Sequence, residues 1–502
     1  MREVSLGLAI IPTLVVLGYM AVLLWMNRRS YGVQEFNEFA TANRAFGVWA
    51  ITFSMMATWY VGASYTAWMG MAVNFGFVYT YTPVYGAFCL ILLYLILDKM
   101  WIWGATHQLN TQGALWGLRY NSNKIKALAG VVGVIASFPW LIMEFWTIGY
   151  LLSHGTYGYL PFLWAMLIGA AIIAVYVALG GMRAVITAHF VQGLLFALGA
   201  TVFTYILIYM NTGGFAATIR NAVANFPEIL TYPGPGWNPP PQWWASIIIT
   251  SSVGGFLWPW AMNRVFASDS VRTAKRATWQ AITIGTLICV FFLFFGLSAH
   301  SLGYARENPQ MVWLWLSDNL GGPVFLTLAL LVAMSAVLST TASLIHFFGA
   351  SIAEDVLKPL NSKLDSRQAT RLAQYVVFGV SVLAFFIANM ELPMLIFVAL
   401  LTYQFIIQLG PGQLLGMYWK RGNAVGAVAG MIAGLAVAFY LTYLHPEGIS
   451  FGGWTPGVWG LVVNTIIYIG CGYALPVDKR TEELFQEVEN YHRQHKLAAA
   501  GR

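Results

Sequence analysis

The chain has 502 residues, of which 59% are hydrophobic and only 9% are charged. Roughly 25% of the residues of a soluble globular protein are charged, so this composition excludes an ordinary soluble domain. It predicts an all-α polytopic membrane protein that forms one helical bundle. The three cysteines, Cys89, Cys289 and Cys471, each lie within an apolar run and lack metal-ligand spacing. The sequence therefore predicts no disulfide framework.

About 13 segments are long and apolar enough to cross a bilayer as helices. Their approximate ranges are 6–27, 46–73, 76–98, 126–152, 160–180, 185–211, 243–264, 278–302, 323–353, 371–390, 393–418, 424–444 and 456–475. The first is followed by Arg28-Arg29 and lacks a small-residue cleavage site, so we interpret it as a retained helix. The polar stretch 481–496 predicts a solvated or surface-lying helix, with no sign of a second catalytic domain.

Lysine and arginine are distributed very unevenly over the connecting loops. If the N-terminus lies outside and the loops alternate, only Arg2, Arg220 and Arg306 of the 26 basic residues fall outside. The positive-inside rule then predicts an outer N-terminus, a cytoplasmic C-terminus and an odd number of spans. The same bias explains the net charge of +7 without a nucleic-acid partner. We expect a multi-pass protein of the inner (plasma) membrane.

The ninth segment carries a run of hydroxyl side chains in the middle of an apolar stretch. At helical spacing, Ser335, Ser339 and Ser343 share one stripe, and Thr340 lies beside it. Hydroxyls at mid-membrane, together with backbone carbonyls, suit a small hard cation. The alternative is that they bond to their own helix or allow two helices to approach closely.

The second and seventh segments contain small residues or a proline where a membrane helix should be regular. The second includes Gly62-Ala63-Ser64, and the seventh includes Gly254-Gly255 followed by Pro259. Close packing or a kink explains each alone, but the two segments lie five helices apart. That spacing predicts an inverted repeat whose broken helices form a site at the membrane midplane.

Five motifs in this order resemble those of the solute:sodium symporter family over nearly the whole chain. They are Gly62–Trp68, Gly180–Val185, Asn263–Ala267 followed by Arg272 and Lys275-Arg276, Ala336–Thr340 through Glu354-Asp355, and Tyr418–Arg421 followed by Gly426-Ala427 and Gly430. The resemblance is to a bacterial member of the family. It implies a LeuT-like core made of an inverted five-helix repeat, with alternating access driven by a sodium gradient. It also places the third motif in a basic cytoplasmic loop.

This resemblance divides the chain into six parts. They are an N-terminal helix with the first cytoplasmic loop (1–45), the first inverted repeat (46–211), an extracytoplasmic loop (212–242), the second inverted repeat (243–418), two C-terminal helices (419–476) and a cytoplasmic tail (477–502).

The resemblance implies a sodium site made of main-chain carbonyls and two adjacent hydroxyls. Matched residue by residue, its ligands are the carbonyls of Ala63, Thr66 and Ala336 and the side chains of Ser339 and Thr340. Such an all-oxygen set suits a hard monovalent cation. Sodium is therefore the expected coupling ion.

Three positions depart from the family pattern and keep the proton in contention as the coupling ion. Tyr65 stands where many members have aspartate, and Ala188-His189 stands where many have Thr-Asp. Glu144 stands where many have glutamine, well inside the fourth span. An intramembrane carboxyl is costly and usually functional. Glu144 and His189 are thus possible coupling residues, and the alternative is that each is a satisfied buried group.

The candidate solute pocket lies between the broken helices and segments four and nine. Its expected lining is Trp59, Tyr65, Trp68, Glu144, Trp258 and Trp260. Aromatic walls with one acid suit an amine through cation–π contact, whereas half-helix N-termini suit a carboxylate. We expect a small polar organic solute, with amino acids or small carboxylates favoured and a proton-coupled amine as the alternative.

Other functional classes have weaker support. The sequence has no HExxH and no clustered metal ligands, so we do not expect an enzyme. A transporter-like sensor or accessory subunit is the remaining alternative. The expected partners are the small-molecule solute and the lipid bilayer, with no nucleic acid, and the protein is expected to be a monomer or a loose oligomer.

Overall fold

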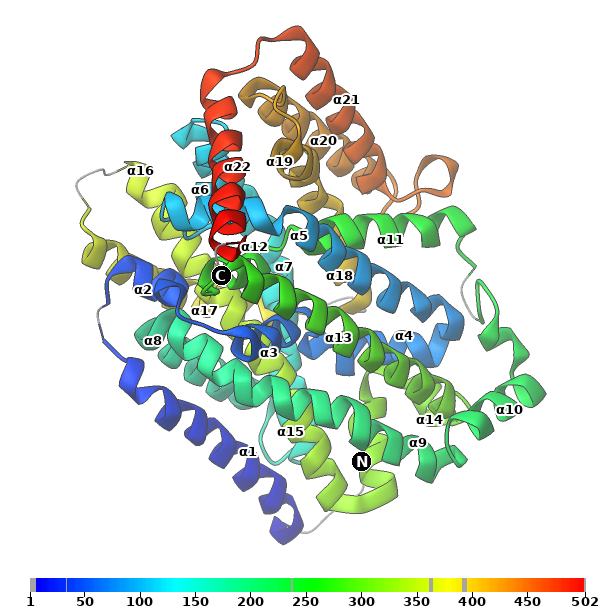
Figure 1. The fold of residues 1–502 in the computed structure, drawn as a ribbon. Coiled ribbons are helices and arrows are strands. Elements are labelled where there is room, and N and C mark those ends of the chain that lie inside the picture. The colour runs from blue at the N-terminus through cyan, green and yellow to red at the C-terminus, as the bar shows by residue number, and fades with distance from the viewer. Residues whose placement is uncertain (1–5, 33, 236–237, 361–363, 391–394, 501–502) are drawn as a thin grey trace.

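The structure is a computed structural model that describes residues 6–32, 34–235, 238–360, 364–390 and 395–500. Within these residues it is all-helical, and the one β-type contact is an isolated bridge between Phe46 and Ser268. The helices assemble into one bundle (Figure 1). The predicted all-α fold class is therefore confirmed for the part of the chain that is described.

The α-helices are α1 (Leu6–Asn27), α2 (Phe36–Thr41), α3 (Val48–Trp59), α4 (Ala67–Phe75), α5 (Tyr81–Thr106), α6 (Gln112–Arg119), α7 (Asn123–Gly155), α8 (Phe162–Leu198), α9 (Thr204–Thr212), α10 (Phe215–Asn225), α11 (Pro241–Phe256), α12 (Pro259–Ala267), α13 (Val271–Ala299), α14 (Gly303–Glu307), α15 (Val312–Ser351), α16 (Lys358–Leu360), α17 (Ser366–Ala388), α18 (Leu395–Ile406), α19 (Gly416–Tyr418), α20 (Ala424–Leu444), α21 (Pro456–Ala474) and α22 (Lys479–Ala500).

Ten helical stretches among the described residues are long and apolar enough to cross a membrane, and the bent pair α11 and α12 makes an eleventh. Three of the ten contain about twice the residues that one crossing needs: Gly62–Thr106 has 45, Phe162–Thr212 has 51 and Pro309–Leu360 has 52. The second turns at Gly181, whose φ of 56° interrupts the helix, and the third turns at Gly322, whose φ is 60°. The number of crossings depends on how these stretches divide, so the count of thirteen stays a prediction.

Both expected interruptions are present, and each has a local cause. α3 ends at Trp59, and the chain leaves helical geometry at Tyr60 and Val61, which have ψ angles of 83° and 165°. A single 3-10 turn, Gly62–Tyr65, then leads into α4. α11 and α12 meet at a bend of 42° where Pro259 opens α12. Proline starts a helix well but cannot continue the hydrogen bonding of the preceding one.

α15 runs through the interior of the bundle, between α7, α8 and α17. Every side chain from Val332 to Ser351 is buried, which includes the whole hydroxyl run. Lipid therefore does not reach these hydroxyls, and their hydrogen-bond partners are other protein groups or transported species.

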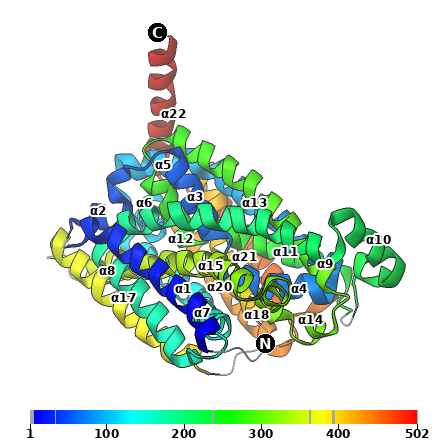
Figure 2. The ribbon, with the colours of Figure 1, turned by 90° about the horizontal axis from the view of Figure 1, so that it is seen from below.

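α22 docks on the bundle with its first turns and then projects from it, on the face opposite to the start of α1 (Figure 2). Leu484, Phe485 and Val488 are buried, and the Trp103 indole donates a hydrogen bond of 2.9 Å to the Leu484 carbonyl. The helix predicted over 481–496 is thus present as part of α22, and its first half is packed rather than solvated.

Candidate functional site

The hydroxyls of Ser339 and Thr340 meet a backbone oxygen at the end of α3. The distances from the Ala57 carbonyl oxygen are 3.0 Å to Ser339 Oγ and 3.3 Å to Thr340 Oγ1. The same two hydroxyls lie 2.8 and 3.1 Å from the Ala336 carbonyl oxygen, one turn back on α15. Two carbonyls and two hydroxyls therefore form one compact cluster, which we call the oxygen cluster.

The break after α3 explains why the Ala57 carbonyl is available. The carbonyls in the last turn of a helix have no amide partner within the helix. Because the chain leaves helical geometry at Tyr60 and Val61, Ala57 lies in that last turn. The oxygen cluster contains only neutral, hard oxygen donors, so its chemistry fits a small alkali cation.

The structure does not place Ala63 and Thr66 at this cluster. Their carbonyls accept backbone hydrogen bonds of 3.2 Å from the Thr66 amide and 3.1 Å from the Gly70 amide. The family resemblance named Ala63 and Thr66, which follow the break, and did not name Ala57 before it; the assignment of Ala63 and Thr66 stays a prediction. Counting back from the expected helix end would have found Ala57, because free carbonyls precede a break.

The flanking serines of the run have other partners. The Ser335 hydroxyl lies 2.8 Å from the Leu331 carbonyl and 3.1 Å from the Tyr19 hydroxyl. Ser343 donates a hydrogen bond of 3.0 Å to the Ser339 carbonyl. Ser335 thus joins α15 to α1 and lies outside the oxygen cluster.

His189 lies directly behind the oxygen cluster, fully buried on α8. Its Nε2 is 2.9 Å from the Ser339 carbonyl oxygen, and its Nδ1 is 3.0 Å from Ser54 Oγ. A carbonyl only accepts, so the hydrogen is on Nε2 and Nδ1 accepts. Both nitrogens are engaged, and the imidazole positions the Ser339 backbone.

The side chain of Glu144, a residue of α7, contacts the start of the turn that leads into α4. Its Oε1 is 3.5 Å from the Ala63 amide nitrogen, and a Cβ on Gly62 would come within 2.6 Å of Oε2. The side chain is fully buried, and Oε2 has no hydrogen-bond partner among the described residues. The carboxyl thus occupies the amide end of the half-helix, where an anionic solute group would otherwise bind.

Four of the six expected pocket residues gather in one aromatic cluster. The centroid of the Trp258 ring lies 4.8 Å from the centroid of Trp260 and 6.4 Å from that of Trp59. Trp59 and Trp68 also line a cavity beside the α3 break. Tyr65 instead packs against other aromatic rings, those of Phe292, Trp313 and Phe196.

Two further members of the aromatic cluster were not expected from the sequence. Trp140 lies 5.0 Å from Trp258 and 5.8 Å from Trp68, between ring centroids, and Tyr403 lies 5.6 Å from Trp258. Only helix packing brings them there. The indole Nε1 atoms of Trp140, Trp258 and Trp260 are buried and have no hydrogen-bond partner among the described residues. Buried donors of this kind normally have an acceptor.

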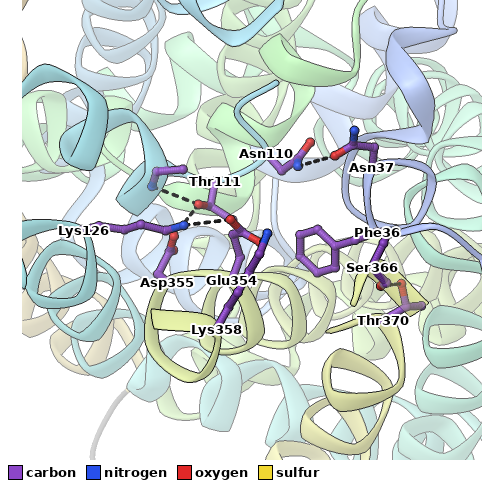
Figure 3. A network of polar contacts seen from close by, with 11 residues as sticks. Phe36, Asn37, Asn110, Thr111, Lys126, Glu354, Asp355, Lys358, Ser366 and Thr370 are labelled. Carbon is purple, nitrogen blue, oxygen red and sulfur yellow. Dashed lines mark hydrogen bonds and ion pairs between the residues drawn. The ribbon is translucent and has the colours of Figure 1, made fainter. Parts of the chain in front are cut away.

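A polar network closes the bundle at the far end of α15, next to α6 and α7 (Figure 3). Its contacts are Thr111–Asp355 at 2.6 Å, Ser351–Asp355 at 2.6 Å, Lys126–Glu354 at 2.7 Å and Lys358–Glu354 at 2.9 Å. Thr111 is also the N-cap of α6 and accepts from the Ala114 amide. Buried charge-assisted hydrogen bonds of this kind hold helices in one arrangement.

A family model and several relatives match most of the chain. The model described as "Sodium:solute symporter family" matches residues 39–434. The chain is 24% identical over 471 residues to the uncharacterized symporter YodF of Bacillus subtilis (strain 168), covering 92% of this chain and 91% of that protein. It is 25% identical over 456 residues to the sodium/pantothenate symporter of Escherichia coli (strain K12), covering 88% and 91%.

A solved structure shares the fold. The substrate-bound outward-open state of a Na+-coupled sialic acid symporter aligns with a TM-score of 0.75 and 17% identity, covering 93% of this chain and 98% of that chain. The expected LeuT-like architecture is thereby confirmed.

Proposed function

Because the chain belongs to the sodium:solute symporter family, we propose that it couples sodium entry to the uptake of a small polar organic solute. Membership of this family makes it a multi-pass membrane transporter and not an enzyme. The two inverted repeats, 46–211 and 243–418, move relative to each other in this proposal and expose the site to each side in turn.

The oxygen cluster carries the sodium assignment. Its ligands are the carbonyls of Ala57 and Ala336 and the hydroxyls of Ser339 and Thr340, with Ala57 taking the place first given to Ala63 and Thr66. A set without carboxylates suits a monovalent ion, since divalent calcium is usually bound by charged ligands. The cluster joins α3 to α15, so a bound ion stabilises the closed arrangement of these helices, and its loss frees them.

Amino acids or small carboxylates remain the favoured solutes. The unpartnered indole donors of the aromatic cluster suit a solute with hydrogen-bond acceptors. The turn Gly62–Tyr65 before α4 already directs the Ala63 amide at Glu144, so the solute's acid group binds at the indoles instead. The Escherichia coli relative is named for pantothenate, an organic acid.

Proton-coupled transport of an amine is the second candidate, and Glu144 favours it. No cationic side chain pairs with this buried carboxyl among the described residues. Such a group is costly to ionise inside a membrane and can carry a proton. An ammonium solute would then be held by Glu144 and by cation–π contact with the indoles.

The topology belongs to the same proposal. The N-terminus lies outside, the C-terminus is cytoplasmic, and the protein is in the plasma membrane as a monomer or loose oligomer. The distribution of basic residues supports this orientation. We refer below to the proposed cytoplasmic side as the inner face.

Uptake into proteoliposomes against a panel of solutes, with sodium and proton gradients imposed separately, tests the function. We expect one class of small organic acid to accumulate when sodium is higher outside, with no accumulation from a proton gradient at equal sodium. Accumulation driven only by protons would support the second candidate instead. Binding of a panel member without accumulation under either gradient would identify a sensor or accessory subunit.

A further inference from the structure

A buried arginine lies beside the oxygen cluster. Arg264, expected in a cytoplasmic loop, is instead fully buried on α12. Its guanidinium donates to side chains on three other helices: 3.1 Å to Ser54 Oγ on α3, 2.6 Å to Ser343 Oγ on α15 and 3.4 Å to His189 Nδ1 on α8. It also donates to the Trp260 carbonyl of its own helix.

The charge of this guanidinium is not balanced by a nearby acid. Its four partners are two hydroxyls, one carbonyl and an imidazole nitrogen that must be unprotonated to accept. No carboxylate within the described ranges forms an ion pair with Arg264. Buried charges are normally paired because desolvation is costly. A full positive charge is thus maintained in the protein interior by neutral partners.

Arg264 lies about one helical turn from the oxygen cluster, toward the inner face. Ser54 precedes Ala57 by three residues on α3, which begins at the inner face in the proposed topology. Ser343 follows Ser339 by four residues on α15, which ends there. The positions of Ser54 and Ser343 on these two helices therefore place the Arg264 guanidinium between the oxygen cluster and the cytoplasm. The link is direct, because Ser343 and His189 each bond to the Ser339 carbonyl.

We propose that Arg264 is the inner gate of the cation site: its guanidinium blocks the route from the oxygen cluster to the cytoplasm, and its charge opposes cation binding. This inference rests on the proposed sodium function. The gate residue is part of the α12 half of the broken span, which bends by 42° from α11. A swing of α12 withdraws the guanidinium from Ser54 and Ser343 and opens the route. The same charge keeps a second cation out of the region between the oxygen cluster and the inner face.

Sodium binding to purified protein, measured through tryptophan fluorescence, tests the charge. Removing a positive charge a few ångströms from a bound cation tightens binding, on the order of a hundredfold at an effective dielectric constant of about 20. We expect this tightening for Arg264→Gln and no such tightening for Arg264→Lys, which keeps the charge. Arg183→Gln is the matched control, because Arg183 is a partly exposed arginine already paired with Glu38.

Unchanged or weaker sodium binding in folded Arg264→Gln would overturn the gate, since a purely structural arginine can only weaken the site when it is lost. If the wild type itself binds sodium no better than choline, the proposed sodium function fails as well. If the wild type binds sodium but Arg264→Gln does not bind it more tightly, the gate is overturned and the proposed sodium function stands.

A second variant tests the block without removing the charge. Ser343→Ala deletes the 2.6 Å hydrogen bond that holds the guanidinium on α15. Without this bond to a charged group, the blocking position of the guanidinium is less stable and the route is open more often. We therefore expect the solute-independent leak of radioactive sodium from proteoliposomes to rise about tenfold. Ser335→Ala, on the same helix but without contact to Arg264, is the control. A leak equal to that of the wild type would contradict the block.

Discussion

The Thr340 hydroxyl on α15 lies 3.3 Å from the carbonyl oxygen of Ala57, the third-last residue of α3. These two residues are far apart in the sequence, and they meet because α3 stops at a break in the middle of the bundle. Ser339 makes the parallel contact at 3.0 Å. The cation site proposed for this transporter is therefore a junction between a broken helix and a continuous one.

Replacing Ser339 and Thr340 together with alanine removes two of the four oxygens of the cluster. Each lost ligand costs more than about 1 kcal/mol, so we expect the sodium concentration for half-maximal uptake to rise by at least about tenfold. Ser335→Ala is the control, since its hydroxyl faces Leu331 and Tyr19. An unaltered sodium dependence in the double variant would rule out this site.

Glu144→Gln keeps the shape of the side chain and an acceptor for the Ala63 amide. If sodium is the coupling ion, we expect sodium-driven uptake to persist within a few-fold of the wild type. If Glu144 carries the proton, uptake driven by a pH gradient disappears while solute exchange remains. Uptake measured at several external pH values with fixed sodium separates the two, and a pH profile identical to the wild type excludes Glu144 as the coupling acid.

Gly62→Ala tests the close packing at the break. The added Cβ would lie 2.4 Å from the Val337 Cβ and 2.6 Å from Glu144 Oε2, and a β-branched neighbour cannot move aside easily. We expect a loss of about 1–3 kcal/mol of stability and a lower melting temperature in detergent. Gly18→Ala is the control, because nothing lies within 4 Å of its added Cβ. Equal melting temperatures for the two variants would contradict the packing.

Thr111→Val removes both the N-cap of α6 and the 2.6 Å hydrogen bond to buried Asp355. Loss of a cap and of a charge-assisted hydrogen bond costs roughly 2–4 kcal/mol together. We expect thermal stability to fall and the inner face to open more often, measured as faster labelling of a cysteine introduced there. Thr370→Val is the matched control, since that hydroxyl bonds only within its own helix, to the Ser366 carbonyl. Similar labelling in both variants would show that the network does not close this face.

The topology is checked with single cysteines in a chain whose three native cysteines are replaced by alanine. Tyr159 is exposed between α7 and α8, and Arg367 is exposed at the start of α17. The positive-inside rule places the first outside and the second inside. We expect a membrane-impermeant maleimide added to intact cells to label Tyr159→Cys but to label Arg367→Cys only after lysis. The reverse pattern would invert the orientation.

The sequence by itself determined the all-α membrane class, the two breaks and the buried hydroxyl run of α15. These features depend on local chemistry: apolar length, small residues and Pro259 act on a helix wherever it packs. Helical spacing puts Ser339 and Thr340 beside each other, and the resemblance to the symporter family singled them out as the candidate pair.

Only the tertiary structure decided which groups these residues meet. The contact of the Ala57 carbonyl with Ser339 and Thr340, the addition of Trp140 and Tyr403 to the aromatic cluster, and the burial of Arg264 all follow from which helix faces pack together. Arg264 illustrates the reason most clearly. Its positive charge predicted a loop, yet neutral acceptors contributed by four helices, including its own, satisfy its hydrogen bonds inside the bundle. No local pattern encodes that convergence.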